Sequence, residues 1–215
     1  MAGGGAFTAL VLAGSRGESD PVAQAAGVEE KCLAPLLGKP MLSWVLEALR
    51  ASGSVERIAV VASRRDLVAP LCEDFGAEVL QAAASPAQSV LDAAEALGSS
   101  YPLLIVTADN PLLTAARIDA FCAEAWASGG DLAAGLVPSA AIRAAFPESR
   151  RTYLRFRDER YSGANLFALL SEQALPAVAF WRRVERDRKK PWRIVRAFGP
   201  DSLLAYDFNL LTLDE

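Results

Sequence analysis

The stretch LVLAGSRGES, residues Leu10 to Ser19, joins an apolar run directly to a loop in which two glycines bracket a serine and an arginine. An apolar run that ends at glycine is typical of a buried strand followed by a turn. In open α/β sheets, ligands bind beyond the carboxyl ends of the strands, where such loops lie. Gly14 and Gly17 would let backbone N–H groups approach an anion, and Arg16 would add a charge-assisted hydrogen bond.

The same alternation of short apolar runs and longer segments with helical periodicity continues along the chain. The predicted strands are Phe7 to Leu12, Arg57 to Ala62, Ala77 to Gln81, Leu103 to Thr107 and Leu132 to Val137. The predicted helices are Met41 to Ala51, Asp66 to Phe75, Ala87 to Leu97, Thr114 to Ala127 and Ala140 to Phe146. Ser52-Gly53 and Gly76 are expected to end the first two helices, in the way that a C-terminal glycine does. This pattern predicts βαβ units on a mostly parallel sheet.

Length and composition favour one domain over residues 1–215, because 215 residues with 52% hydrophobic side chains can bury one large core. From residue 151 the character changes, and TYLRFRDERYSGANLFAL predicts two strands joined by the charged turn RDER. We see neither a repeat nor a low-complexity linker, so this second half is expected to elaborate the same domain.

The charge balance and the scarcity of metal-binding side chains exclude several functions. The net charge is −4 and the pI is about 5.1, which disfavours nucleic acid as a partner. The chain has no histidine, and its three cysteines are far apart, so the usual zinc sites and imidazole bases are excluded. The sequence shows neither a membrane-length apolar run nor a signal peptide, so we expect the protein in the cytoplasm.

The segment EEKCLAPLLGKPMLSWVLEAL places Lys31 and Lys39 on either side of an irregular, proline-containing stretch. The order LAGSRG, then a lysine, then PLLGKPML resembles the nucleotidyltransferases that activate sugars, alditols, isoprenoid precursors and the molybdenum cofactor. The resemblance is closest to the molybdenum-cofactor guanylyltransferase-like branch, the MobA-like NTP transferases. It implies a Rossmann-like (glycosyltransferase-A-type) three-layer α/β sandwich, with a nucleotide-binding core over 1–138 and an acceptor-side elaboration with a C-terminal metal-site segment over 139–215.

The resemblance also implies an activity, namely Mg²⁺-dependent transfer of NMP from an NTP to a phosphorylated small-molecule acceptor with release of pyrophosphate. Two alternatives stay open at this point. One is a catalytically silent relative that binds a nucleotide and serves as a regulatory or scaffolding module. The other is a related glycosyltransferase, although no clear D-x-D metal motif supports it. The protein is expected to be a monomer or a homodimer.

A metal site is indicated by LLIVTADNPLLT, in which Asp109 follows an apolar strand. A turn before Pro111 would also explain this aspartate. The family has G-D-x-P here, and the resemblance implies that Asp109 holds Mg²⁺, a cation that needs few protein carboxylates. Near the C-terminus, YDFNLLTLDE is similar to the family's second metal motif. It implies Asn209 as the second ligand, with Asp207 as the alternative.

The resemblance assigns the remaining site residues. The catalytic residues it implies are Arg16, Lys31 and Asp109. The nucleotide-binding residues it implies are Leu12, Ala13, Gly14, Ser15, Gly17, Gln88 and Ser89. The acceptor-binding residues it implies are Gly163 and Asn165. Lys189 and Lys190 are also expected to bind the acceptor, but because they belong to a basic run that the family's motifs do not require. For Gln88 and Ser89, the start of an ordinary packing helix is an equally good explanation, and Asn165 would also suit the start of a strand.

A basic run from Arg182 to Arg193, FWRRVERDRKKPWR with its flanking residues, stands out in an acidic protein. Such a charge run is usually a solvated helical face. Three functional interpretations compete: an arm that grips the acceptor's phosphate, a patch that contacts an anionic membrane surface, and a contact with nucleic acid. An activating enzyme fits an acceptor phosphate or a lipid precursor better than nucleic acid.

Overall fold

The computed structural model describes residues 5–14, 20–157 and 159–185. The chain divides into two compact units. The first unit comprises Met1–Ala133 and Asn165–Ala179, and the second comprises Ala134–Ala164 and Phe180–Glu215. Within the described ranges, no helix combines the length and the apolar character that crossing a membrane would require.

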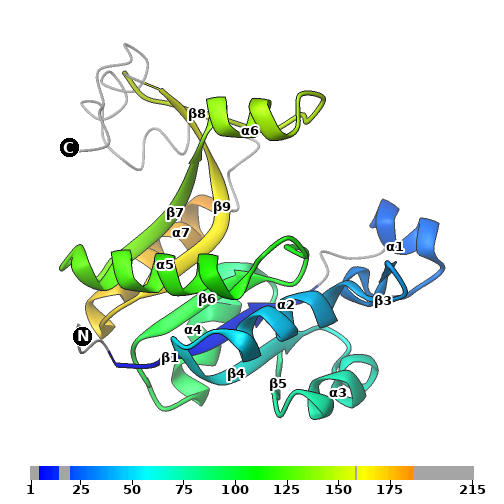
Figure 1. The fold of residues 1–215 in the computed structure, drawn as a ribbon. Coiled ribbons are helices and arrows are strands. Elements are labelled where there is room, and N and C mark those ends of the chain that lie inside the picture. Colours follow the sequence, from blue (N-terminus) through cyan, green and yellow to red (C-terminus); the bar gives the residue numbers. More distant parts are fainter. Residues whose placement is uncertain (1–4, 15–19, 158, 186–215) are drawn as a thin grey trace. The chain divides into compact units, whose positions relative to one another are not determined.

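The first unit is built on a mostly parallel sheet (Figure 1). Its strands are β1 (Phe7–Leu12), β4 (Val55–Ala62), β5 (Glu78–Gln81), β6 (Leu103–Thr107) and β9 (Arg160–Leu169), and the sheet order is β5-β4-β1-β6-β9-β7, with β7 spanning Leu132–Pro138. The pairs β1–β4, β1–β6 and β4–β5 are parallel, whereas β9 runs antiparallel to β6. The predicted sheet is thus confirmed, with one antiparallel strand added.

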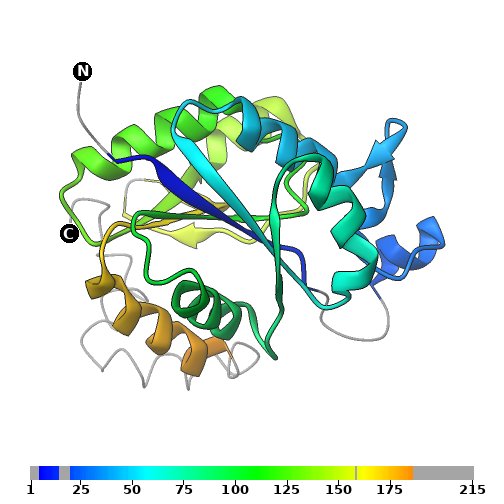
Figure 2. The same ribbon diagram turned by 90° about the horizontal axis from the view of Figure 1, so that it is seen from below.

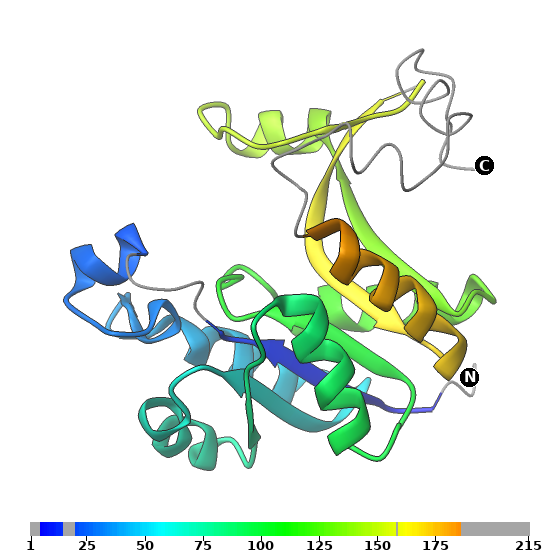
Figure 3. The ribbon, with the colours of Figure 1, turned by 180° about the vertical axis from the view of Figure 1, so that it is seen from behind.

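Helices cover both faces of this sheet, as the sequence predicts for a three-layer α/β fold (Figure 2). The helices of the first unit are α1 (Pro21–Ala26), α2 (Met41–Ala51), α3 (Arg65–Asp74), α4 (Pro86–Ala96) and α5 (Ala115–Ala127). The helices α2 and α5 contact each other on one face, and α4 packs on β1 from the other face (Figures 2 and 3). The helix α7 (Leu175–Glu185) begins after the short helix η2 (Glu172–Ala174).

The strand β1 is the centre of the core because it is covered on both faces. Its residues Phe7, Ala9, Leu10 and Val11 are fully buried, which explains why the sequence there is continuously apolar instead of alternating. On the α4 face, Leu10 lies in a buried cluster with side chains from four other elements: Val61, Val90, Ala94, Leu103 and Leu169.

The predicted boundaries of the elements are close to those observed. β1, β6 and α2 begin and end at the predicted residues, and the other predicted strands and helices differ by one or two residues at an end. Gly76 adopts the left-handed conformation, with φ of 61°, after the end of α3. α2 ends at the predicted Ser52-Gly53, but its cap is an extended Ser52 and not a left-handed glycine. The Ser52 hydroxyl donates a 2.5 Å hydrogen bond to Asp119 of α5.

The second unit contains most of β7, α6 (Ser139–Ala145), β8 (Leu154–Arg155) and the first half of β9, so the sheet continues into it. β8 and β9 pair antiparallel, with Leu154 opposite Tyr161, which confirms the two strands predicted around RDER. The Phe156 and Tyr161 rings meet edge to face, with centroids 5.5 Å apart. The Ser139 hydroxyl of α6 donates to Glu159 at 2.9 Å and so connects the helix to the turn.

Candidate active site at the carboxyl edge of the sheet

The ends of β1 and β6 lie side by side because the two strands are parallel and in register, with Leu12 opposite Thr107. The Ala108 N–H donates to the Leu12 carbonyl at 3.0 Å, and the Ala13 N–H donates to the Val61 carbonyl at 2.8 Å. Gly14 and Asp109 each follow these strand ends by two residues. Two segments that are far apart in the sequence therefore meet at one edge, where α/β sheets bind their ligands.

Lys31 also lies at this edge, in a segment for which the sequence predicts neither a helix nor a strand. Asp20 caps α1 by accepting from the Val22 N–H at 2.9 Å, and Gly27 ends the helix in the left-handed conformation. Lys31 then opens the short helix η1 (Lys31–Leu33). Its Nζ lies 2.6 Å from Asp109 Oδ2, and the exposed fractions of the two side chains are 31% and 39%.

The charge of Asp109 is stabilised by this contact. Partial burial by itself would raise the pKa of the Asp109 carboxyl, but the hydrogen bond from Lys31 and the lysine's positive charge outweigh it and hold the pKa below the ordinary value. The carboxylate is therefore ionised at neutral pH. It combines negative charge with partial exposure, and both are properties of a Mg²⁺ ligand.

Lys39, the second lysine of the motif segment, faces a different set of partners. It belongs to the hairpin of β2 (Pro35–Leu36) and β3 (Lys39–Pro40). Its ammonium group forms an ion pair with Glu47 and lies 3.6 Å from the centroid of the Trp44 ring. Both partners belong to α2, so Lys39 fixes the hairpin to that helix.

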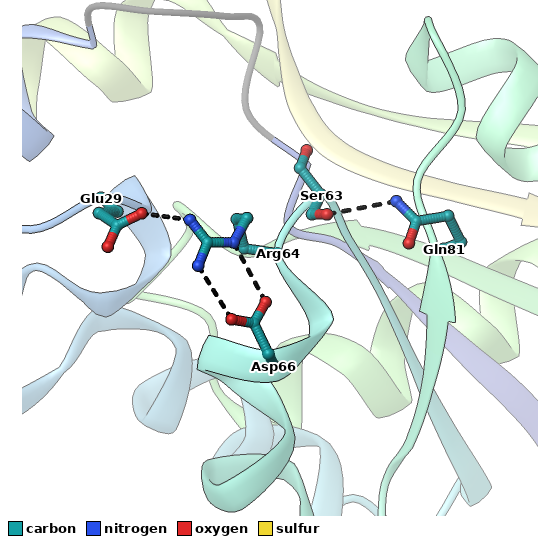
Figure 4. A network of polar contacts seen from close by, with 5 residues as sticks. All are labelled: Glu29, Ser63, Arg64, Asp66 and Gln81. Carbon is teal, nitrogen blue, oxygen red and sulfur yellow. Dashed lines mark hydrogen bonds and ion pairs between the residues drawn. The ribbon is translucent and has the colours of Figure 1, made fainter.

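Gly14 lies where three strand ends pack closely together. A Cβ atom at Gly14 would lie 3.1 Å from the Ala82 Cβ and 3.5 Å from the Ser63 hydroxyl. The Gln81 side chain adds a 3.2 Å hydrogen bond to the Ser63 carbonyl, which ties the ends of β4 and β5 together (Figure 4). Glycine at position 14 thus permits an approach between chain segments that any larger residue would oppose.

Gln88 and Ser89 make the contacts expected at the start of a helix. Ser85 caps α4 by accepting from the Gln88 N–H at 3.2 Å. The Ser89 side chain is 4% exposed, and its hydroxyl accepts from the Ala83 N–H at 2.9 Å. Ser89 therefore stabilises the loop that follows β5. Any effect of Ser89 on ligand binding would be indirect, through the position of that loop.

Of the expected acceptor-binding residues, Asn165 has an unusual backbone. Its φ is 56°, in the left-handed region, although it lies within β9. Asparagine tolerates this region better than most residues, yet it is uncommon within a strand. Gly163 belongs to the second unit, and no atom lies within 4 Å of a Cβ added there.

Several expected site residues lie outside the described residues, namely Ser15, Arg16, Gly17, Lys189, Lys190, Asp207 and Asn209. Among the described residues, no group of three or more Cys, Asp or Glu side chains is arranged to hold a metal ion. Asp109 is therefore the member of the expected Mg²⁺ site whose surroundings can be described.

Sequence reasoning missed an ionic network at the neighbouring strand end. Arg64, between β4 and α3, contacts Asp66 through two of its nitrogens and forms an ion pair with Glu29 (Figure 4). The signal in the sequence was the charged triplet Arg64, Arg65 and Asp66 directly after a buried strand. Glu29 is 35 residues away from Arg64 in the sequence, and no motif predicts that the two residues form an ion pair.

Comparisons with known proteins extend over most of the chain. The profile of the MobA-like NTP transferase domain matches residues 9–154. A 3-deoxy-manno-octulosonate cytidylyltransferase from Zea mays is 32% identical over 95 residues, which are 42% of this chain and 32% of the relative. A bifunctional protein GlmU from Caldanaerobacter subterraneus is 38% identical over 88 residues, which are 39% of this chain and 19% of the relative.

These matches span no more than about a third of the length of the curated relatives. A solved structure, described as a hypothetical transferase from Thermus thermophilus, is similar over a much larger share of both chains. It is 31% identical and superimposes with a TM-score of 0.79, covering 97% of this chain and 84% of the other. The similarity thus includes the strand ends at which Lys31 and Asp109 meet.

Proposed function

The chain belongs to the MobA-like NTP transferase domain family, and from this premise we propose that it transfers NMP from an NTP to a phosphorylated small-molecule acceptor. Pyrophosphate is the second product. The observation that carries the proposal is the contact between Lys31 and Asp109 at the carboxyl edge of the sheet. In this proposal the lysine is the cation that binds phosphates, and the aspartate is the carboxylate that binds a metal. The cytidylyltransferase name of the Zea mays relative supports the same class of reaction.

Asp109, together with Asn209 and with Asp207 as the alternative, would hold Mg²⁺ in this proposal. Asp109 fits the ion because its carboxylate is ionised and partly exposed. Bound Mg²⁺ supplies charge neutralisation and orientation of the triphosphate. Only oxygen ligands are involved, which agrees with the hard character of this cation.

Lys31 exchanges partners during the proposed reaction. Without ligand its ammonium group is paired with Asp109, and the triphosphate offers it a stronger anionic partner. Lys31 and Arg16 then neutralise the negative charge that builds up on the leaving pyrophosphate. These interactions grow stronger in the transition state, which is the condition for accelerating the reaction.

The acceptor phosphate needs no base to become a nucleophile, because it is ionised at neutral pH. One of its oxygens attacks the α-phosphorus in line, a new P–O bond forms, and the bond to the β-phosphate breaks with its electron pair going to pyrophosphate. This chemistry suits a chain without histidine. Orientation and charge neutralisation supply the catalysis.

The remaining residues bind the two substrates in this proposal. The backbone at Leu12, Ala13, Gly14, Ser15 and Gly17 approaches the phosphates, and Gln88 and Ser89 support the nucleotide. Gly163, Asn165, Lys189 and Lys190 contact the acceptor. We propose that residues 1–215 act as one cytoplasmic transferase domain, as a monomer or homodimer, with the basic run meeting the acceptor or an anionic membrane.

A pyrophosphate-release assay tests the proposal. The purified chain is incubated with each NTP, a panel of phosphorylated sugars and alditols, and Mg²⁺ or EDTA. We expect release only with one matched pair of substrates and only with Mg²⁺. Binding of an NTP without release under any condition would indicate a catalytically silent relative, and release of nucleoside diphosphate from a nucleotide sugar would indicate a glycosyltransferase.

A further inference from the structure

Arg64 joins two segments that border the proposed active site. Its Nε lies 3.1 Å from Asp66 Oδ1 and its Nη2 lies 2.9 Å from Asp66 Oδ2, so the guanidinium holds this carboxylate with a fork. Its remaining terminal nitrogen, Nη1, forms an ion pair with Glu29 Oε2. Figure 4 shows the guanidinium between the two carboxylates.

The charges around Arg64 do not suit the binding of a phosphate. Two carboxylates surround one guanidinium, so the cluster as a whole carries a negative charge. The hydrogen bond from Arg64 also holds the pKa of Asp66 below its ordinary value, which keeps that carboxylate ionised. A triphosphate would have to displace a carboxylate from Arg64 before it could bind there. The network is better suited to connecting chain segments than to binding an anion.

One of the connected segments carries Lys31. Glu29 lies two residues before Lys31, and the side chains of Glu30 and Cys32 are buried, with exposed fractions of 2% and 4%. The backbone from 29 to 32 is therefore held on one side by the buried side chains of Glu30 and Cys32, and on the solvent side by the ion pair of Glu29 with Arg64. Arg64 in turn pairs with Asp66 in the first turn of α3, where the helix dipole favours a carboxylate.

We infer that Arg64 is a positioning residue, which fixes the segment of Glu29 so that the ammonium group of Lys31 stays at the carboxyl end of β6. This inference rests on the proposed function, because it assigns to Arg64 an effect on the step that Lys31 assists. Arg64 itself touches neither phosphate nor acceptor in this assignment. A displacement of about 1 Å at a charge-stabilising group is enough to slow a reaction substantially.

The test replaces Arg64 by methionine and uses Arg57→Met as the matched control. Arg57 lies near the amino end of β4, away from the proposed site. Its side chain has the same exposed fraction of 46% and pairs with Glu78 at 2.6 Å instead of with Glu29. We expect Arg64→Met to lower kcat by about tenfold or more and to leave the dissociation constant of the NTP unchanged. The control is expected to change neither.

A double-mutant cycle identifies the route of the effect. In a Lys31→Ala background, Arg64→Met should cause no further loss of kcat, because the group that it positions is already missing. An undiminished loss in that background would overturn the inference. So would weaker NTP binding with normal kcat, which would make Arg64 a direct phosphate ligand.

Two further measurements complete the test: a second variant, in case Arg64→Met folds poorly, and a hydrogen-exchange experiment that does not depend on activity. Glu29→Gln cuts the connection from the other side and retains the Arg64–Asp66 fork, so it should reproduce the loss even if Arg64→Met folds poorly. Hydrogen exchange of the amides of residues 27–33 should rise in both variants and not in Arg57→Met. If the wild-type chain releases no pyrophosphate with any substrates, the proposed function fails, while unchanged exchange alone refutes the positioning role.

Discussion

Lys31 and Asp109 are 78 residues apart in the sequence, and in the folded chain the lysine Nζ lies 2.6 Å from the aspartate Oδ2. The pair joins the short helix that follows α1 to the end of a central strand. Each residue neutralises the other in the absence of ligand. In the proposed reaction a triphosphate with its cation would offer both residues a new partner, so the contact would be exchanged when substrates bind.

Asp109→Asn should reduce pyrophosphate release by at least about a hundredfold at saturating NTP, because a ligand that positions a metal accounts for several kcal/mol of charge stabilisation. The fold should persist, since asparagine has the same size. Asp74→Asn, at the exposed end of α3, serves as the control for loss of a surface charge. Near-normal turnover of Asp109→Asn at limiting Mg²⁺ would show that another residue is the principal ligand.

Lys31→Ala should lower kcat by about 10²- to 10³-fold and change the NTP dissociation constant much less, because negative charge increases on the pyrophosphate as the bond breaks. Lys39→Ala is the control, since Lys39 is paired with Glu47 on α2. Steady-state kinetics and calorimetric titration with NTP separate the two quantities. An effect confined to affinity would assign Lys31 to binding of the ground state.

The lowered pKa of Asp109 predicts how the stability contributed by its ion pair depends on pH. The folded-state pKa lies below the ordinary value of 3.8, so this contribution is present above pH 3.8 and is lost as the pH falls through the folded-state pKa. The difference in Tm between the wild type and Asp109→Asn should therefore shrink below a pH of about 4. Because both side chains are partly exposed, we expect less than about 1 kcal/mol at neutral pH. A difference that grows in acid would contradict this.

Gly14→Ala should destabilise the chain by about 1–3 kcal/mol, because the new Cβ would lie 3.1 Å from the Ala82 Cβ and both atoms are fixed to backbone. The ends of β1 and β5 would have to separate, and NTP binding should weaken as well. Gly53→Ala is the control, since no atom lies within 4 Å of a Cβ there. Thermal unfolding and NTP titration of both variants measure the two effects.

Replacing Lys189, Lys190 and Arg193 together by glutamine should leave the NTP dissociation constant unchanged and raise the KM of the acceptor. If the basic run instead contacts membranes, the triple variant should lose salt-sensitive binding to anionic vesicles, to which each basic residue contributes about 1 kcal/mol. Vesicle sedimentation at two salt concentrations distinguishes these outcomes. A variant that changes neither property would identify the run as a solvated surface.

The order of the main strands and helices could be predicted from the sequence because each of them carries a local signal, whereas α1, the β2–β3 hairpin and α7 were not predicted. Central strands such as Phe7–Leu12 are apolar throughout, and α2 has a regular apolar face, so their bounds followed directly. The insertion of β9 between β6 and β7 could not be predicted, because strand order depends on pairing between distant residues. The same holds for the cap of α2, because the hydrogen bond from the Ser52 hydroxyl to Asp119 joins residues that are 67 positions apart.

The candidate site likewise contains residues that the sequence predicts and residues that it does not. Lys31 and Asp109 follow from motifs with fixed spacing, whereas Arg64 and Glu29 have no motif and become partners only through the fold. Lys39 shows a further limit of reasoning from motifs, because the motif contains this lysine but does not predict its contacts. Its place in a signature segment says nothing about the Trp44 ring that it covers, because that contact depends on how the hairpin is turned towards α2.

The antiparallel pairing of β9 with β6 also sets a condition on the synthesis of this protein. β6 ends at Thr107, but its second edge is paired with Leu166 to Leu169, about sixty residues later. While the ribosome makes the intervening chain, an apolar strand has one row of unsatisfied backbone groups, and such edges pair readily with other chains. Nascent chains that stall before residue 169 should therefore depend on chaperones more than the completed polypeptide does.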